Sequence, residues 1–304
     1  MENYKIGVVL VTFNRLSKLE KAVKCYASQN TLPFYMIIVD NASSDGTKEF
    51  LDDWMRKNEN FKKIVVTLPE NIGGSGGFYE GLKHAVKLDA DWIWVADDDA
   101  YPENNCFSIA MNFLQNHQTQ NISALCGAVM YDGEISLKHR RRTFACGLKF
   151  RTDPVCKEEY NYSDFRFNTY SFVGAVLNKT KLKSAGLPKK DYFIWCDDSE
   201  HSLRMSKIGE IICLPSMRIN HDECPESRTF SWKTYYGLRN HLDMIRSNFS
   251  TLFFFVQLIK ITYVSIKLFF ENKQKGFLYL TAIKDALTRN FGLHKKYRPG
   301  WKLN

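Results

Sequence analysis

The stretch WIWVADDDAYPE, residues 92–103, is an apolar run that ends in three consecutive carboxylates. Packing three like charges together costs free energy unless a cation or hydrogen-bond donors compensate for it. Oxygen ligands suit Mg²⁺ or Mn²⁺, so Asp97, Asp98 and Asp99 are candidates for a divalent metal site that would bridge a diphosphate. The alternative is an acidic turn that caps the next helix. A position at the end of a parallel strand favours metal and ligand binding.

Upstream of this stretch, three further apolar runs alternate with segments of helical periodicity. Ser17 and Glu20 form a capping box that would open the first helix. Four apolar runs separated by helices imply βαβ units and a mostly parallel sheet, with ligands bound at the carboxyl ends of its strands. The polar turns after the four strands should therefore share one edge with the three aspartates. We expect strands at residues 5–11, 35–39, 63–68 and 92–96, and helices at about 17–29, 47–56 and 78–88.

The downstream part of the chain gives a mixed pattern. Beyond about residue 228 it should be entirely helical. Between these limits we expect a helix after Pro102, strands at 123–130, 170–177 and 210–214, a helix at 197–208, and an irregular basic stretch that includes 139–142.

A glycine-rich segment, NIGGSGGF at 71–78, follows the third strand. Side chains at Gly73, Gly74, Gly76 and Gly77 would hold the backbone away from a bulky ligand or force strained dihedrals. A flexible turn is the alternative. The segment is not the dinucleotide fingerprint, because Tyr79 occupies the place of its third glycine. The fingerprint would also follow the first strand, whereas this segment follows the third.

Taken in order, four of these motifs resemble the donor half of a family 2 glycosyltransferase with the GT-A fold. They are VTFN at 11–14, DNASSDGT at 40–47, NIGGSGGF and the aspartate triplet. The run FIWCDDSEHSLRMSKIG at 193–209 and His221 also match in order and approximate spacing, so the resemblance covers about residues 4–246. It implies an α/β fold of GT-A type: a Rossmann-like, mostly parallel sheet with helices on both faces, plus a C-terminal helical extension.

The resemblance also implies a division of the chain and a set of donor-site roles. A catalytic domain at 1–227 would comprise a donor half at about 1–102 and an acceptor half at about 103–227, followed by a helical region at 228–304. Asp97 would face the ribose or the metal, Asp99 would be the principal metal ligand, and His221 would complete the metal shell. The remaining donor-binding residues would be Thr12, Asn14, Asp40 and Asn41 around a uridine, with Asp98 and the four glycines. Residues 40–47 could instead be only a turn in which Asp45 caps a helix.

The second acidic motif, WCDDSEH at 195–201, would supply the acceptor chemistry. Transfer with inversion needs one carboxylate to take the proton from the acceptor hydroxyl. The resemblance gives this role to Asp198, with Asp197 as the competing base. Asp197 and Glu200 would orient the acceptor, although their D-x-x-E spacing is also that of a helix cap. Trp195 could stack on a sugar or pack in the core.

Two further segments are weaker candidates. The run HRRR at 139–142 could hold an acceptor phosphate, with a solvated basic loop as the default interpretation. The run YYGLRNHLDMIR at 235–246 recurs in these transferases, and there Arg239 or His241 could touch the diphosphate.

Within the family, the GGSGGF form most resembles galactofuranosyltransferases. This points to UDP-galactofuranose as donor and to a lipid-linked saccharide of bacterial surface polysaccharide synthesis as acceptor. A rhamnosyl or other hexosyl transferase is the alternative within the family. A sugar nucleotidyltransferase is disfavoured, because TFNRLSK stands where its glycine-rich phosphate loop belongs. A non-catalytic sugar-nucleotide binder is disfavoured by the intact acidic motifs.

The net charge of +9 is unevenly distributed, since residues 228–304 hold fourteen Lys and Arg but only three acids. Such a region suggests an anionic partner, and the chain shows no nucleic-acid motif. Residues 251–270 are apolar but carry Gln257, Lys260 and Lys267, which makes them a poor membrane span and a better amphipathic helix lying on an anionic membrane surface. Packing on the catalytic domain or in a homo-oligomer is the alternative.

The eight cysteines show no CxxC pair, which fits a reduced compartment. The amino-terminal residues pass directly into a strand-like run without the features of a secretion signal. We therefore expect a cytoplasmic protein, peripheral on the inner face of the cell membrane.

Overall fold

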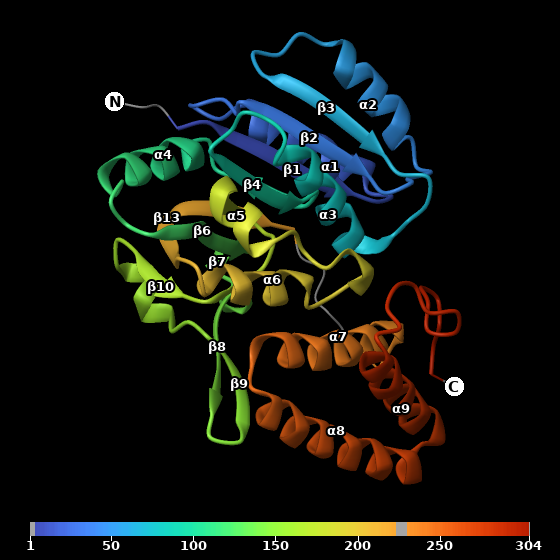
Figure 1. Ribbon diagram of the computed structural model, residues 1–304. Coiled ribbons are helices and arrows are strands. Elements are labelled where there is room, and N and C mark those ends of the chain that lie inside the picture. Colours follow the sequence, from blue (N-terminus) through green and yellow to red (C-terminus); the bar gives the residue numbers. More distant parts are fainter. Residues whose placement is uncertain (1–3, 223–229, 304) are drawn as a thin grey trace.

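The computed structural model describes residues 4–222 and 230–303. Within these residues a ten-stranded sheet crosses the molecule (Figure 1). Along this sheet the strands follow in the order β10 (Phe165–Phe167), β13 (Glu210–His221), β6 (Ile122–Tyr131), β12 (Ala175–Asn178), β4 (Trp92–Asp97), β1 (Ile6–Thr12), β2 (Tyr35–Asp40) and β3 (Lys62–Thr67), with β5 (Ala100–Pro102) beside β13 and β7 (Glu134–Ile135) beside β6.

The four strands predicted in the first hundred residues are all present and parallel. β1 lies between β2 and β4, and β2 pairs with β3. Their register places Thr12 opposite Asp40 and Val11 opposite Asp97, so the carboxyl ends meet at one edge as expected. The sheet is mixed only farther on, where β12 is antiparallel to both β4 and β6.

Helices cover both faces of the sheet, which confirms the predicted architecture. Successive residues of a strand point to opposite faces, so Val8 and Leu10 belong to one buried cluster while Val9 and Val11 belong to another. The first face packs against α1 (Leu16–Ala27), α2 (Thr47–Arg56) and α4 (Cys106–Asn116), and the second against α3 (Gly73–Ala85), α5 (Lys179–Ala185) and α6 (Asp197–Ser206).

The predicted capping box of the first helix is wrong. α1 begins at Leu16, so Ser17 already lies inside the helix. The N-cap residue is Arg15, and its side chain makes no capping hydrogen bond to the described residues. The carboxylate of Asp45 accepts from the Leu16 amide at 2.9 Å instead. The cap comes from the turn after β2, which local spacing cannot show.

The glycine-rich segment is the first turn of α3 and not a loop before it. The helix begins at Gly73, five residues earlier than predicted. Gly73 has a φ of +79°, and a Cβ there would lie 1.9 Å from the carbonyl oxygen of Phe193. Gly73 thus allows the segment before α6 to pack directly on the start of α3.

Two further glycines are also explained by packing within the protein. A Cβ on Gly76 would lie 2.6 Å from Ile72 Cδ1, and one on Gly77 would lie 2.5 Å from Val11 Cγ1. Only at Gly74 would a Cβ meet no described atom within 4 Å. The expectation of strained dihedrals is therefore met at Gly73, with its φ of +79°, while packing within the protein accounts for Gly76 and Gly77. Contact of these glycines with a ligand stays a prediction.

Gly77→Ala should destabilise the protein by about 1–3 kcal/mol, because the added methyl group overlaps Val11 and forces α3 away from β1. Gly74→Ala is the matched control on the same helix, and it should leave stability unchanged or raise it by up to about 1 kcal/mol. Urea unfolding of both variants measures the difference. Equal stability of the two would contradict close packing at Gly77.

The strand predicted at 170–177 is two strands in different sheets. β11 (Thr169–Tyr170) pairs with β8 (Arg140–Cys146), which pairs with β9 (Lys149–Pro154) in a small antiparallel sheet. Gly174, with a φ of +65°, lies between β11 and β12 and lets the backbone turn into the main sheet. The basic stretch expected to be irregular is therefore the beginning of β8.

Beyond residue 230 the chain forms helices between Trp232 and Thr288, as predicted, whereas residues 289–303 form no helix. In Figure 1 these helices lie below the sheet, with α7 nearest to α6. The predicted boundary at 227/228 lies outside the described residues, and the division into domains stays a prediction. The helices are α7 (Trp232–Asn248), α8 (Thr251–Glu271) and α9 (Lys273–Thr288).

Short 3₁₀ turns lie earlier in the chain, at Leu137–His139, Lys157–Asn161 and Lys190–Tyr192.

Candidate active site

The first acidic motif forms a compact cluster at the carboxyl edge of the sheet. β4 ends at Asp97, and β5 pairs with β13 so that His221 lies opposite Ala100. The ligand atoms of Asp97, Asp99 and His221 lie within 4.8 Å of one another. His221 Nε2 is 3.1 Å from Asp99 Oδ1. The predicted grouping of these three residues is confirmed.

The pKa values of the cluster show the cost of gathering its charges. Burial and then the charge of Asp99 raise the pKa of Asp97 to about 8. Burial also raises the pKa of Asp98 to about 6. Burial opposes ionisation of Asp99, but its hydrogen bond to His221 and the charges of His221, Arg15 and Lys18 together outweigh burial and leave the pKa of Asp99 below its ordinary value. Two carboxylate oxygens and an imidazole nitrogen in this setting fit a divalent metal ion.

Two basic side chains that the sequence analysis overlooked reach into this cluster. Arg15 Nη1 lies 2.9 Å from Asp99 Oδ2 and 3.2 Å from Asp98 Oδ1. Lys18 Nζ lies 3.2 Å from the same Asp99 oxygen. Both come from α1 and its N-cap, directly after β1. Their presence directly after the first strand, in TFNRLSK at 12–18, is the sequence feature that could have identified them.

The residues expected around the uridine lie at this edge, but they differ in exposure. Thr12 and Asp40 are 1% exposed and Asn41 is 2% exposed, whereas Asn14 is open to solvent. Thr12 Oγ1 donates to Asp98 Oδ2 at 2.7 Å. Asn41 donates to the carbonyl of Gly73 at 3.0 Å and so holds the start of α3. Thr12 and Asn41 thus position their neighbours, and contact with a nucleoside stays a prediction.

The second acidic motif follows a segment of strained backbone. Phe193, Trp195 and Cys196 have φ values of +69°, +66° and +66°. A residue other than glycine in this region costs about 1–3 kcal/mol, and such strain gathers at functional sites. One side chain from α7 holds the segment: Asn240 Nδ2 donates to the carbonyls of Tyr192, Ile194 and Trp195 at 2.9–3.0 Å.

This bend presents the two candidate bases differently. Asp198 is partly exposed, and its Oδ1 accepts from the hydroxyl of Ser199 at 3.0 Å. Asp197 is only 7% exposed, and burial followed by the charge of Asp198 raises its pKa to about 7. The predicted helix cap is wrong, because Cys196 occupies the N-cap position of α6 and both aspartates lie inside the helix.

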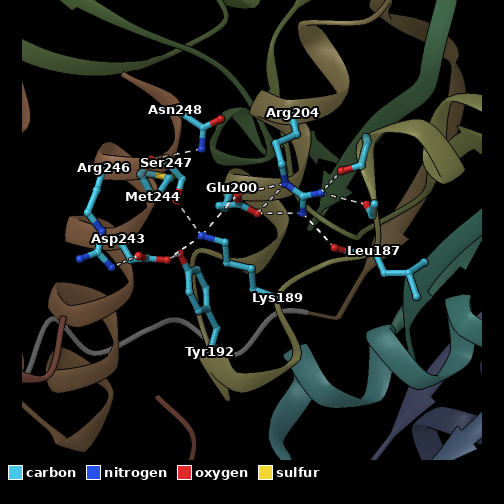
Figure 2. A network of polar contacts seen from close by, with 12 residues as sticks. Leu187, Lys189, Tyr192, Glu200, Arg204, Asp243, Met244, Arg246, Ser247 and Asn248 are labelled. Atoms are coloured by element: carbon cyan, nitrogen blue, oxygen red, sulfur yellow. Dashed lines mark hydrogen bonds and ion pairs between the residues drawn. The ribbon is translucent and has the colours of Figure 1, made fainter. Parts of the chain in front are cut away.

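Glu200 cannot contact an acceptor, contrary to our prediction. Its side chain is fully buried. Arg204 binds both of its carboxylate oxygens, at 3.0 and 2.9 Å, and Lys189 Nζ lies 3.7 Å away (Figure 2). Glu200 is therefore a structural anion within α6, and its one-turn spacing from Arg204 is that of a helical ion pair.

Figure 2 shows that Lys189 connects this ion pair to α7. Its Nζ lies 2.6 Å from Asp243 Oδ2, a carboxylate that also accepts from Tyr192 at 2.8 Å and pairs with Arg246. Burial alone would raise the pKa of Asp243, but Lys189 and Arg246 outweigh it and the pKa is lowered. The base-bearing α6 is thus tied to the C-terminal helices by buried charges.

Trp195 lies at the surface beside the candidate bases. It is 36% exposed, which excludes the alternative of full core packing. The edge of its ring rests on Gly237 of α7, where a Cβ would lie 2.8 Å away. Its exposed face is therefore available for stacking on a sugar, and that role stays a prediction.

The basic run at 139–142 is not a solvated loop, contrary to the default interpretation. Arg140 is fully buried and donates to backbone carbonyls, while Arg142 forms a two-pronged ion pair with Glu159. Arg141 Nη2 donates to the Ser199 hydroxyl at 2.9 Å. Only Arg141 reaches the second acidic motif, where it remains a candidate for acceptor phosphate.

The same strand entrance touches the first acidic motif. The rings of His139 and His221 lie edge to face with centroids 5.3 Å apart. His139 Nδ1 is 2.7 Å from the Ser171 hydroxyl. Since Arg141 is two residues from His139, β8 joins the metal-type cluster to the candidate bases.

Neither candidate from the run at 235–246 faces this edge. Arg239 is 1% exposed and donates to the carbonyls of Gly292, Asp191 and Tyr192. His241 packs against Phe150, and burial lowers its pKa to about 4. The expectation that they touch a diphosphate is wrong, and both are part of the helical packing.

A family comparison agrees with this geometry. The profile of Glycosyl transferase family 2 matches residues 7–184, more than half of the chain. The chain belongs to this family. Among curated relatives it is similar to galactofuranosyltransferase GlfT1 of Mycolicibacterium smegmatis, 26% identical over 67% of this chain and 66% of the relative, and to GlfT1 of Mycobacterium tuberculosis, 25% identical over 67% and 65%. The chain thus spans just under two thirds of these relatives.

Solved structures show the same fold. The likeness to S. aureus TarS 1-349 has a TM-score of 0.59 at 15% identity and covers 94% of this chain and 82% of that one. GalNAc-T7 with UDP, GalNAc and Mn²⁺ gives a TM-score of 0.62 at 15% identity, over 80% and 48%. The fold is therefore GT-A, as the sequence predicted.

Asp243→Asn should lower the free energy of unfolding by about 1–3 kcal/mol near neutral pH, because a buried anion with three donors is lost. The pKa of Asp243 is depressed in the folded chain, so its stabilisation is complete above the ordinary Asp pKa of about 4 and is lost as the pH falls through the folded value. The gap between native protein and variant should therefore close in acid. Unfolding midpoints measured over a pH series test this.

Asp52→Asn serves as the control, since Asp52 lies on the surface of α2 and pairs only with Lys48 among the described residues. It should change stability little at any pH. A gap for Asp243→Asn that stays constant down to acid pH would contradict the proposed ionic network.

Proposed function

We propose that this protein is an inverting glycosyltransferase that transfers galactofuranose from UDP-galactofuranose to a lipid-linked saccharide in bacterial surface polysaccharide synthesis. One observation carries the proposal: the chain that enters β8 contacts both acidic motifs. The ring of His139, directly before the strand, lies edge to face with that of His221, and Arg141 within the strand donates to Ser199, the neighbour of Asp198. Donor and acceptor chemistry would meet between them.

In the proposed reaction an acceptor hydroxyl oxygen attacks the anomeric carbon of the donor sugar. The bond from that carbon to the diphosphate breaks, and UDP leaves with its electron pair. Asp198 takes the hydroxyl proton as the new bond forms. A Mn²⁺ or Mg²⁺ ion held by Asp97, Asp99 and His221 would supply charge stabilisation for the departing diphosphate. Arg15 and Lys18 carry positive charge to the same place.

Asp198 is preferred over Asp197 as base because of exposure. Asp198 reaches solvent, whereas Asp197 is 7% exposed. Arg141 donates to the same Ser199 hydroxyl that binds Asp198, so it would hold this carboxylate in place.

The donor is proposed from the glycine-rich segment and from the names of the two GlfT1 relatives. A rhamnosyl or other hexosyl transferase is the alternative. It is supported by a Campylobacter jejuni relative named GalNAc(5)-diNAcBac-PP-undecaprenol beta-1,3-glucosyltransferase, 26% identical over 58% of this chain and 54% of its own length. That name also supports a lipid-linked acceptor.

We further propose a cytoplasmic protein that is peripheral on the inner face of the cell membrane. The excess of basic residues beyond 228 supports an anionic membrane surface as partner. Among the described helices, Thr251–Glu271 is long and apolar enough to span a bilayer. Self-association through the same helices is the competing arrangement.

Asp99→Ala should abolish metal-dependent use of the donor, whereas Asp198→Asn should preserve donor binding and lower kcat for transfer by at least about 10²-fold. UDP binding by calorimetry, with and without Mn²⁺, is measured alongside transfer. Transfer at the native rate by both purified variants would refute the mechanism. Glu200→Gln is the contrasting change, because it should affect stability before it affects acceptor affinity.

UDP-galactofuranose should release its nucleoside diphosphate faster than UDP-galactopyranose, UDP-glucose or dTDP-rhamnose when each is incubated with the protein and Mn²⁺; the product followed is UDP for the UDP sugars and dTDP for dTDP-rhamnose. The expected preference is at least about tenfold, the scale of one or two well-placed hydrogen bonds. A preference for another donor would replace galactofuranose in the proposal while leaving the acid and metal roles unchanged.

A further inference from the structure

Helix α8 turns its most apolar face away from the protein. Its outer stripe consists of side chains that are each 49–84% exposed and that recur every three or four residues, which is one face of an α-helix. The face toward the protein buries Phe253 and Phe254 and also the polar residues Gln257 and Ser265. The residues of the outer stripe are Leu252, Phe255, Ile259, Tyr263, Ile266 and Phe270.

The outer stripe is more apolar surface than the fold requires. A helix that only covers a core places its apolar side chains inward and its polar ones outward. The outer stripe extends over about 27 Å of helix at 1.5 Å per residue. A continuous apolar surface of this length marks an interaction site in soluble proteins.

A second, sequence-distant segment continues this surface. At the tip of the β8–β9 hairpin, Leu148 is 58% exposed and Phe144 is 40% exposed. The Leu148 carbonyl accepts from Gln257 Nε2 at 2.8 Å and from Lys260 Nζ at 2.6 Å, which fastens the tip to α8. In Figure 1 the hairpin and α8 extend to the same side of the molecule.

Aromatic packing supports the same attachment. Phe150 of β9 lies 5.5 Å from Phe249 and 6.5 Å from Phe253, measured between ring centroids. The hairpin and α8 therefore form one rigid surface at this end.

Charge selects the partner. Lys149 beside the tip and Lys273 beside Phe270 are both exposed, so cations stand at the two ends of the apolar surface. Residues 228–304 carry an excess of eleven positive charges, and a second copy on the stripe would bring two such regions face to face. An apolar strip flanked by lysines fits an anionic bilayer instead, with its apolar side chains among the acyl chains and its cations at the headgroups.

We propose that the outer stripe of α8 and the tip of the β8–β9 hairpin together form one docking surface for an anionic phospholipid bilayer, on which α8 lies flat. Spanning the bilayer would take Lys260 and Lys267 into its interior, at about 2.5–3.5 kcal/mol each. It would also separate α8 from the hairpin and from α9, which packs against it through Phe269 and Phe277.

The surface sets the height of the acceptor site above the lipid. β8 runs from Arg141, beside Ser199, to Cys146 at the tip. Five residue steps of an extended strand span about 17 Å. This consequence rests on the proposed function: a saccharide that projects from a lipid diphosphate would meet Asp198 at that height.

The test uses the full-length protein and sedimentation with vesicles of phosphatidylcholine, alone or mixed with phosphatidylglycerol. The native protein should bind the mixed vesicles, and high salt should weaken binding. The double variant Ile259→Ser/Tyr263→Ser and, separately, Leu148→Ser should each reduce the partition coefficient by at least about tenfold. Met55→Ser is the matched control, because Met55 is 44% exposed on α2 and should have no effect.

Each outcome decides the proposal. Native-like binding by the double variant, or no vesicle binding by the native protein, would overturn it. A native dimer that the double variant dissociates, without lipid binding, would assign the stripe to a second copy and overturn it too. UDP release from the sugar donor should stay unchanged in all variants. Absence of UDP release in the native protein would refute the proposed function while leaving the vesicle result intact.

Discussion

The left-handed backbone between Phe193 and Cys196 is the constraint on which the acceptor side of the site depends. Three residues in that conformation cost about 1–3 kcal/mol each, so the bend would relax without support. Asn240 gives that support through the two N–H donors of its side-chain amide, which are shared among three backbone carbonyls and are worth about 0.5–1.5 kcal/mol per hydrogen bond. Because Asn240 lies on α7, the helices beyond residue 230 are part of the site and not an appendage to it. The buried charges of Lys189 and Asp243 reinforce the same attachment.

The chain that enters β8 contacts both acidic motifs. His139, directly before the strand, contacts the ring of His221 and the hydroxyl of Ser171. Arg141, within the strand, donates to the Ser199 hydroxyl, which in turn donates to Asp198. The strand belongs to a small sheet outside the main one, so its position is set by side-chain contacts with both halves. A shift of this strand would therefore alter the spacing of the metal-type cluster and the candidate base together.

The sequence predicted the donor half well because buried parallel strands are continuous apolar runs with turns at their carboxyl ends. It failed where a distant partner decides the structure. The start of α3 depends on Asn41 and on the segment at Phe193, which no local pattern shows. Glu200 was given an acceptor role because its spacing from Asp197 matched a motif, whereas its real partners are Arg204 and Lys189. Motif order nevertheless brought Asp97, Asp99 and His221 together correctly, since paired strands bring their ends together.

The C-terminal helices contact the rest of the protein on one side and expose an apolar surface on the other. Their inner side holds the bend before α6 through Asn240 and Asp243, while the outer side of α8 carries the apolar stripe. Movement of α7 away from α6 would break the ion pair between Lys189 and the buried Asp243 and leave a buried charge unpaired, which costs about 3–5 kcal/mol. A flexible tether would let the site sample many heights above a surface. Here α7 is tied to α6 by buried charges, and α8 packs on α7 through apolar side chains. If Asp198 is the base, as proposed, this attachment would keep it at one height above the surface.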